Sequence, residues 1–142
     1  MLRMSYTVCL VLLVFLTPLH VVGQQMCQTM DTVPGFANEY LVDEYHEQVV
    51  QQIQKAANLD QILVGVYTVG NNMVAAGQAT MIPAGTRIVI LNTKPLTGTS
   101  TSGSGKMNHP TLGERPEVKL RGRLLETGDV FWFHSSGLDF GR

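Results

Sequence analysis

Histidine side chains are the first residues in this chain that could bind a metal ion or move protons. His46-Glu47 begins like the zinc-binding motif His-Glu-x-x-His, in which two histidines one helical turn apart hold the ion. Val50 occupies the position of the second histidine. His109 and His134 are expected in a loop and in a strand, at spacings that fit no metal motif. The sequence therefore predicts no metal site and no other cofactor, with His46 on a helix surface.

Motifs for nucleotide binding or nucleophilic catalysis are incomplete. Residues 103–106 (Gly-Ser-Gly-Lys) look like the end of a phosphate-binding loop, but Ser100 stands where the first glycine belongs and Met107 replaces the magnesium-binding Ser or Thr. There is no Gly-x-Ser-x-Gly nucleophile elbow. Asp43 and Glu47 lie one helical turn apart, as exposed acids on a helix commonly do. We predict no catalytic residues and a protein that is not an enzyme.

Cysteine could link this chain to another. The chain has two cysteines. Cys9 lies in a segment that we expect to be removed, so Cys27 is the only remaining thiol and an internal disulfide is excluded. A lone cysteine in an oxidising compartment indicates either an intermolecular bridge or a buried thiol. Because Cys27 is close to the expected new N-terminus, the sequence favours a homodimer or a mixed disulfide through Cys27.

A row of cations could bind an anion. Lys119, Arg121 and Arg123 alternate with apolar residues, so they are expected on one face of a strand. Together they could bind a phosphate, a sulfated glycan or a matrix-associated anion. The alternative is a charged outer face that keeps an edge strand from aggregating.

An aromatic strand follows this row. Residues 131–133 are Phe-Trp-Phe, so at least one ring must point away from the buried side of a sheet. Trp132 is the candidate for an exposed aromatic that contacts a ligand or partner. The alternative is a sheet that is covered on both faces.

The N-terminus has the layout of a secretory signal peptide. Arg3 supplies the positive charge, residues 8–16 are apolar, Pro18 ends that run, and Gly23 provides a small residue for cleavage. A membrane-spanning helix needs about 20 apolar residues, and no second stretch is long enough. We therefore expect residues 1–23 to be removed and the protein to be secreted into the extracellular space, with no membrane span after cleavage.

The charge of the expected mature chain is small. Of 142 residues, 119 remain after residue 23, with 9 basic and 11 acidic side chains. Residues 24–86 contain one base and six acids, whereas residues 87–142 contain eight bases and five acids. This asymmetry fits self-association, a local anion site or two solvated faces. No nucleic-acid partner is expected.

The elements that must position these residues follow from the apolar pattern. Residues 24–36 are expected to form a flexible N-terminal arm. Residues 38–58 predict an amphipathic helix with Asn38 as its N-cap. The β-branched run 62–69 predicts a strand, with residues 73–80 as its partner. Residues 87–91 predict a third strand.

The second half completes the predicted sheet. The Thr/Ser/Gly-rich stretch 97–106 predicts a mobile loop. Period-two alternation over 118–124, a turn at 126–129 and an aromatic run over 130–134 predict a hairpin. The expected fold class is α+β, with one amphipathic helix packed on an antiparallel sheet of about four or five strands, in a single domain over residues 37–142.

These features together predict a small secreted, non-enzymatic protein that acts by binding or assembly. An extracellular matrix component or a soluble interaction protein fits them best. One alternative is a carrier of a small apolar ligand. Another is a peptide precursor, because the chain ends in Phe140-Gly-Arg142. Such an ending resembles the C-termini of amidated neuropeptide precursors.

Overall fold

The computed structural model describes residues 24–97, 106–109 and 113–141. The expected signal peptide and most of the expected mobile loop lie outside these residues. The described helices are α2 (Glu39–Lys55), α3 (Leu59–Ala75) and the short 3-10 helix η3 (Ser135–Gly137). The described strands are β1 (Met26–Thr29), β2 (Val33–Phe36), β3 (Ala79–Ile82), β4 (Arg87–Pro95), β5 (Lys106–His109), β6 (Gly113–Pro116), β7 (Val118–Leu124), β8 (Val130–His134) and β9 (Leu138–Asp139).

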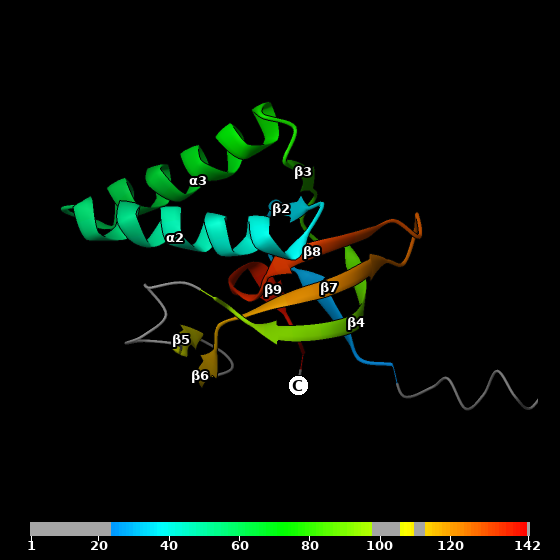
Figure 1. Cartoon of the computed structure of the whole chain (residues 1–142). Coiled ribbons are helices and arrows are strands. Elements are labelled where there is room, and N and C mark those ends of the chain that lie inside the picture. Colours follow the sequence, from blue (N-terminus) through cyan, green and yellow to red (C-terminus); the bar gives the residue numbers. More distant parts are fainter. Residues whose placement is uncertain (1–23, 98–105, 110–112, 142) are drawn as a thin grey trace, which may run out of the picture.

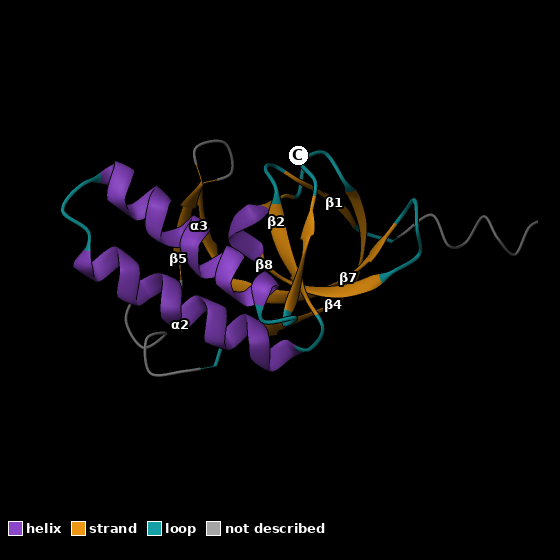
Figure 2. Ribbon diagram, turned by 90° about the horizontal axis from the view of Figure 1, so that it is seen from above, coloured by secondary structure: helices purple, strands orange, loops and turns teal. Residues whose placement is uncertain are grey.

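Seven of these strands form one curled, half-barrel sheet in the order β3-β2-β8-β7-β4-β1-β9, and every pairing is antiparallel. Strands β5 and β6 pair separately with each other. The two helices lie side by side as a layer over the sheet (Figure 1). Seen from above, the end where α2 passes into α3 extends past the seven-stranded sheet (Figure 2).

The sequence prediction for α2 is confirmed. The side chain of Asn38 caps the helix by accepting a hydrogen bond from the backbone N–H of Leu41 at 3.1 Å. Lys55 lies in the last turn, where a cation complements the helix dipole. The buried face carries Val42, Tyr45 and His46 and packs toward the sheet.

The prediction of a strand over residues 62–69 is wrong, because this segment is part of helix α3. Asn58 caps it by accepting from Gln61 N–H at 3.0 Å. Its most enclosed side chains recur at helical spacing, with Val69 and Met73 buried. Gly65 allows α2 and α3 to approach, since a Cβ there would lie 2.9 Å from Cβ of Gln52. Packing thus outweighs the strand preference of the β-branched residues.

The predicted fold class is therefore corrected. Two helices, not one, cover a seven-stranded sheet rather than one of four or five strands. Residues 24–36 supply two of the extra strands, β1 and β2, where the sequence predicts a flexible arm. The predicted hairpin of β7 and β8 is confirmed, with Leu120 opposite Phe133.

The sheet carries a hydrophobic core on each face. One core lies inside the curl and contains Cys27, Ile82, Ile88, Leu120, Leu124, Phe133 and Leu138. The second core lies beneath the helices and contains Phe36, Val42, Tyr45, Val69, Met73 and Leu96. Alternation along β8 divides its aromatics between these cores, because Phe133 belongs to the first and Trp132 packs against the second.

Candidate functional site

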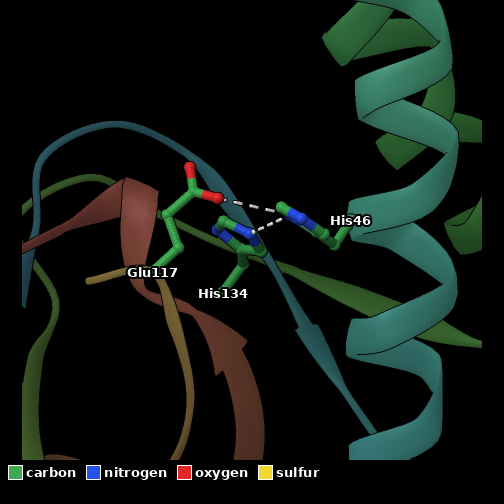
Figure 3. A group of neighbouring side chains, drawn as sticks. All are labelled: His46, Glu117 and His134. Atoms are coloured by element: carbon green, nitrogen blue, oxygen red, sulfur yellow. Dashed lines mark hydrogen bonds and ion pairs between the residues drawn. The ribbon is translucent and has the colours of Figure 1, made fainter. Parts of the chain in front are cut away.

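Two histidines from distant parts of the chain meet beneath helix α2. Nδ1 of His46 lies 2.8 Å from Nε2 of His134, and the two rings are stacked with centroids 5.0 Å apart. Oε2 of Glu117 lies 3.6 Å from the same Nδ1 of His46. Figure 3 shows the carboxylate and both rings converging on one point. We call His46, Glu117 and His134 the histidine cluster.

Three elements position the histidine cluster. His46 follows Tyr45 on the buried face of α2. His134 is the last residue of β8 and caps η3. Glu117 lies between β6 and β7, where the chain enters the large sheet. Because α2 packs on the sheet through its apolar stripe, His46 is brought against the end of β8.

Hydrogen bonds at the far side of His134 fix its tautomer. The backbone N–H of Ser136 donates to Nδ1 of His134 at 3.1 Å, and Oγ of Ser136 lies 2.7 Å from the same nitrogen. A nitrogen that accepts a backbone N–H carries no proton of its own. In neutral His134 the proton is therefore on Nε2, which donates to Nδ1 of His46.

The environment of His134 disfavours its charged form. Burial lowers the pKa of His134 to about 3, and the charge of neighbouring His46 adds to this shift. The phenol of Tyr45, whose ring meets that of His134 edge-on at 5.9 Å, is also enclosed, and burial raises its pKa to about 12. The imidazole of His134 is consequently neutral throughout the physiological pH range.

Oγ of Ser136 lies as close to Nδ1 of His134 as a serine nucleophile lies to its general base. The imidazole of His134 is, however, too weak a base for this role. A general base works best when its pKa lies near the working pH. With a pKa of about 3, His134 does not draw a proton from a serine hydroxyl at neutral pH. Nδ1 of His134 also accepts the backbone N–H of Ser136, so the imidazole acts as the N-cap of η3.

A cleft adjoins the histidine cluster. Its volume is about 290 Å³. It is lined by residues of α2, α3, β2, β3 and η3 and of the turn before β2, namely Asp31, Thr32, Val33, Pro34, Tyr45, Leu63, Val66, Tyr67, Gly70, Met81, Ser136 and Gly137. We call it the α3 cleft. Tyr45 and Ser136 belong to its wall and also contact His134, so the cleft and the histidine cluster share that wall.

One polar contact connects the sides of the α3 cleft. The hydroxyl of Tyr67 on α3 donates to Oδ2 of Asp31 at 2.9 Å. A backbone hydrogen bond from Thr32 and this bond from Tyr67 lower the pKa of Asp31. Asp31 is thus a carboxylate at the rim of a mostly apolar cleft.

The structure divides the predicted cation row. Lys119 lies beneath α2, with Nζ 2.7 Å from Asp43 Oδ2 and 3.5 Å from Glu39 Oε2. Its charge is already paired inside the protein. Arg121 and Arg123 are exposed farther along the same strand. Lys119 therefore does not join the two arginines on the surface.

Trp132 is half-buried. Its ring packs against the core beneath the helices, and Nζ of Lys94 lies 5.6 Å from the ring centroid. A cation over a tryptophan face is attracted by the ring's quadrupole. Part of this face is therefore occupied by a residue of the same chain.

Cys27 lies in β1 and belongs to the core inside the curl, with 5% of its surface exposed. Burial, and to a smaller extent the charge of Asp139, raises the pKa of the Cys27 thiol to about 12. The reactive species in disulfide chemistry is the thiolate. The folded protein therefore holds Cys27 in its least reactive form.

Sequence reasoning did not find the histidine cluster or the α3 cleft. The prediction of His46 on a helix surface is wrong, because His46 is 6% exposed and lies beside Tyr45 on the buried face of α2. This placement on the apolar stripe was the available signal. No pattern connects residues 46, 117 and 134, which are far apart in the chain and meet only through packing. His109 lies in β5.

Family models, curated proteins and solved structures contain no match to this chain. Within residues 24–97, 106–109 and 113–141, none of the helices is long and apolar enough to cross a membrane.

Proposed function

We propose that this protein is a small secreted, non-enzymatic binding protein, and that the α3 cleft takes up a small molecule with an apolar body. The observation that carries the proposal is the surface of α3. Only Asp60 among its 17 residues is charged, and about half or more of the surface is exposed in each of Leu59, Leu63, Val64 and Tyr67. A soluble helix ordinarily turns a polar face to water.

Two of these exposed apolar side chains, Leu63 and Tyr67, line the cleft. Leu63, Val66 and Tyr67 come from α3, and Pro34 and Met81 lie opposite them on β2 and β3. Small-molecule sites are mostly apolar concavities with a few placed polar groups. Asp31 and Ser136 are the polar groups here. The ligand class is therefore an apolar molecule carrying one hydrogen-bonding group.

Filling the cleft tests the proposal. A Cβ at Gly70 would lie 3.5 Å from Cε of Met81 and 3.9 Å from Cγ of Pro34, which is ordinary contact. Gly70→Leu should therefore fold and extend its side chain into the cleft. We expect this variant to weaken binding of the neutral fluorophore N-phenyl-1-naphthylamine at least tenfold, because the volume for it is lost.

Leu59→Ala is the matched control, since Leu59 is exposed on the same helix but does not line the cleft. It should bind the fluorophore as the unmodified protein does. Equal binding by the unmodified protein and Gly70→Leu contradicts the assignment of the cleft. Extraction of natively secreted protein with organic solvent, followed by mass spectrometry, then identifies the natural ligand.

A further inference from the structure

The histidine cluster offers the ligand atoms of a transition-metal site. Two imidazole nitrogens and one carboxylate oxygen lie within 4.8 Å of one another. Two histidines with one carboxylate form a known ligand set for zinc, with a fourth position left to water. We propose that His46, Glu117 and His134 bind one Zn²⁺ ion, which connects helix α2 to the end of β8.

The distances are close to those that zinc requires. Zn–N bonds of about 2.0–2.1 Å in a tetrahedron place neighbouring ligand atoms about 3.4 Å apart. His46 Nδ1 and Glu117 Oε2 are already 3.6 Å apart. The two histidine nitrogens, at 2.8 Å, must separate by about half an ångström. Zinc binding therefore requires small rotations of the two side chains.

The histidine cluster is accessible to an ion from the solvent. The carboxylate of Glu117 keeps part of its surface exposed, with 22% of its side chain accessible, which gives an ion a route to the cluster. Histidine nitrogens select zinc and copper over magnesium and calcium.

Ser136 is the positioning residue of this site. A metal ion on Nε2 of His134 requires the proton to move to Nδ1. Oγ of Ser136, at 2.7 Å, can accept a hydrogen bond from that Nδ1–H, whereas the Ser136 backbone N–H can only donate. Zinc binding therefore exchanges the backbone hydrogen bond for one to the hydroxyl. This exchange is a cost, and it should hold the affinity in the micromolar range rather than at the tighter values of four-ligand sites.

The protein for the test is the mature chain, made without a histidine tag and stripped of metal with a chelator. It is titrated with Zn²⁺ alone, and binding is measured by isothermal calorimetry. We expect one ion per chain, with a rise in the thermal midpoint as zinc is added. His46→Gln should abolish binding. Glu117 lies at a partly exposed position, and Glu117→Gln keeps the shape of its side chain. This variant should weaken zinc binding at least tenfold. Ser136→Ala should weaken it about tenfold, because hydrogen-bond partners of metal-binding histidines typically contribute that much.

Glu44→Gln, at an exposed position of the same helix as His46, is the control for loss of a carboxylate and should leave binding unchanged. Absence of saturable binding by the unmodified protein overturns the proposal. Unchanged binding in Glu117→Gln also overturns it, and this readout does not depend on whether His46→Gln folds. Because the titration uses no apolar ligand, its failure leaves the α3 cleft to be judged by its own experiment.

Discussion

Lys119 is a charged residue that is buried and paired inside the protein rather than exposed on its surface. Lys119 is 3% exposed, and Asp43 and Glu39 on α2 pair with its ammonium group. Asp43 also accepts hydrogen bonds from the backbone N–H and the hydroxyl of Thr97, both at 2.8 Å. This carboxylate therefore joins α2 to β7 and to the segment that follows β4.

The residue-scale prediction concerns Asp43→Asn. Losing this carboxylate leaves a buried ammonium with Glu39 alone, so we expect the free energy of unfolding to fall by roughly 3 kcal/mol, the lower end for a broken buried pair. Chemical denaturation measures this loss. Glu44→Gln, at an exposed position of the same helix, should change stability by less than about 0.5 kcal/mol. Equal losses in the two variants contradict the assigned role.

The same contact has a pH dependence. Burial by itself raises the pKa of Asp43, but hydrogen bonds from Lys119 and Thr97 outweigh it and hold the pKa below its ordinary value. A carboxyl that is more acidic when folded stabilises the protein above its unfolded pKa, and this stability is lost as pH falls through the folded pKa. Stability should therefore decline below about pH 4, with a smaller slope in Asp43→Asn.

At the scale of elements, the sheet depends on a close approach between β7 and β4. A Cβ added at Gly122 would collide with Cγ2 of Ile88 and would lie 3.2 Å from Cδ2 of Leu120. Ile88 and Leu120 are both fully buried. The curl of the sheet leaves no room for a side chain at this point.

We therefore expect Gly122→Ala to destabilise the protein by about 1–3 kcal/mol through overpacking. Gly70→Ala is the matched control, because its methyl group meets only ordinary contacts and alanine is preferred to glycine in a helix. The control should be as stable as the unmodified protein or more so. Thermal or urea unfolding of both variants measures the difference, and a Gly122→Ala protein of unchanged stability contradicts the packing argument.

At the scale of the whole molecule, the two ends of the described chain meet. β9 pairs with β1, with Leu138 opposite Thr29, and Leu138 is 1% exposed in the core inside the curl. Phe140 packs against the same core. Residues 138–140 thus complete the sheet and the core inside the curl.

A chain that ends at Gly137 should therefore be less stable, by about 2–5 kcal/mol for the loss of a buried leucine alone. A chain that ends at Phe140 retains β9 and should unfold close to the unmodified protein. Denaturant midpoints of the three proteins measure the effect. If the two shortened chains are equally stable, β9 does not contribute to the core.

The sequence alone determined the elements whose signals are local. Helix α2 was predictable because Asn38 caps an uninterrupted apolar stripe, and the β7–β8 hairpin was predictable because apolar and charged residues alternate from Val118 to Leu124. The signal peptide at the N-terminus and the secreted location of the protein remain predictions, which rest on the same kind of local pattern. Helix α3 could not be separated from a strand, since β-branched residues favour strands and only its packing on α2 decides the outcome.

Tertiary structure decided everything that depends on which distant residues meet. Cys27 became part of a core because β1 joins the sheet, and Lys119 became part of an ion pair because α2 covers its face of β7. His46 and His134 meet because a helix packs on the end of a strand 88 residues later in the chain. Periodicity fixes which face of an element is buried, but not what lies across from it, so the histidine cluster appears only in three dimensions.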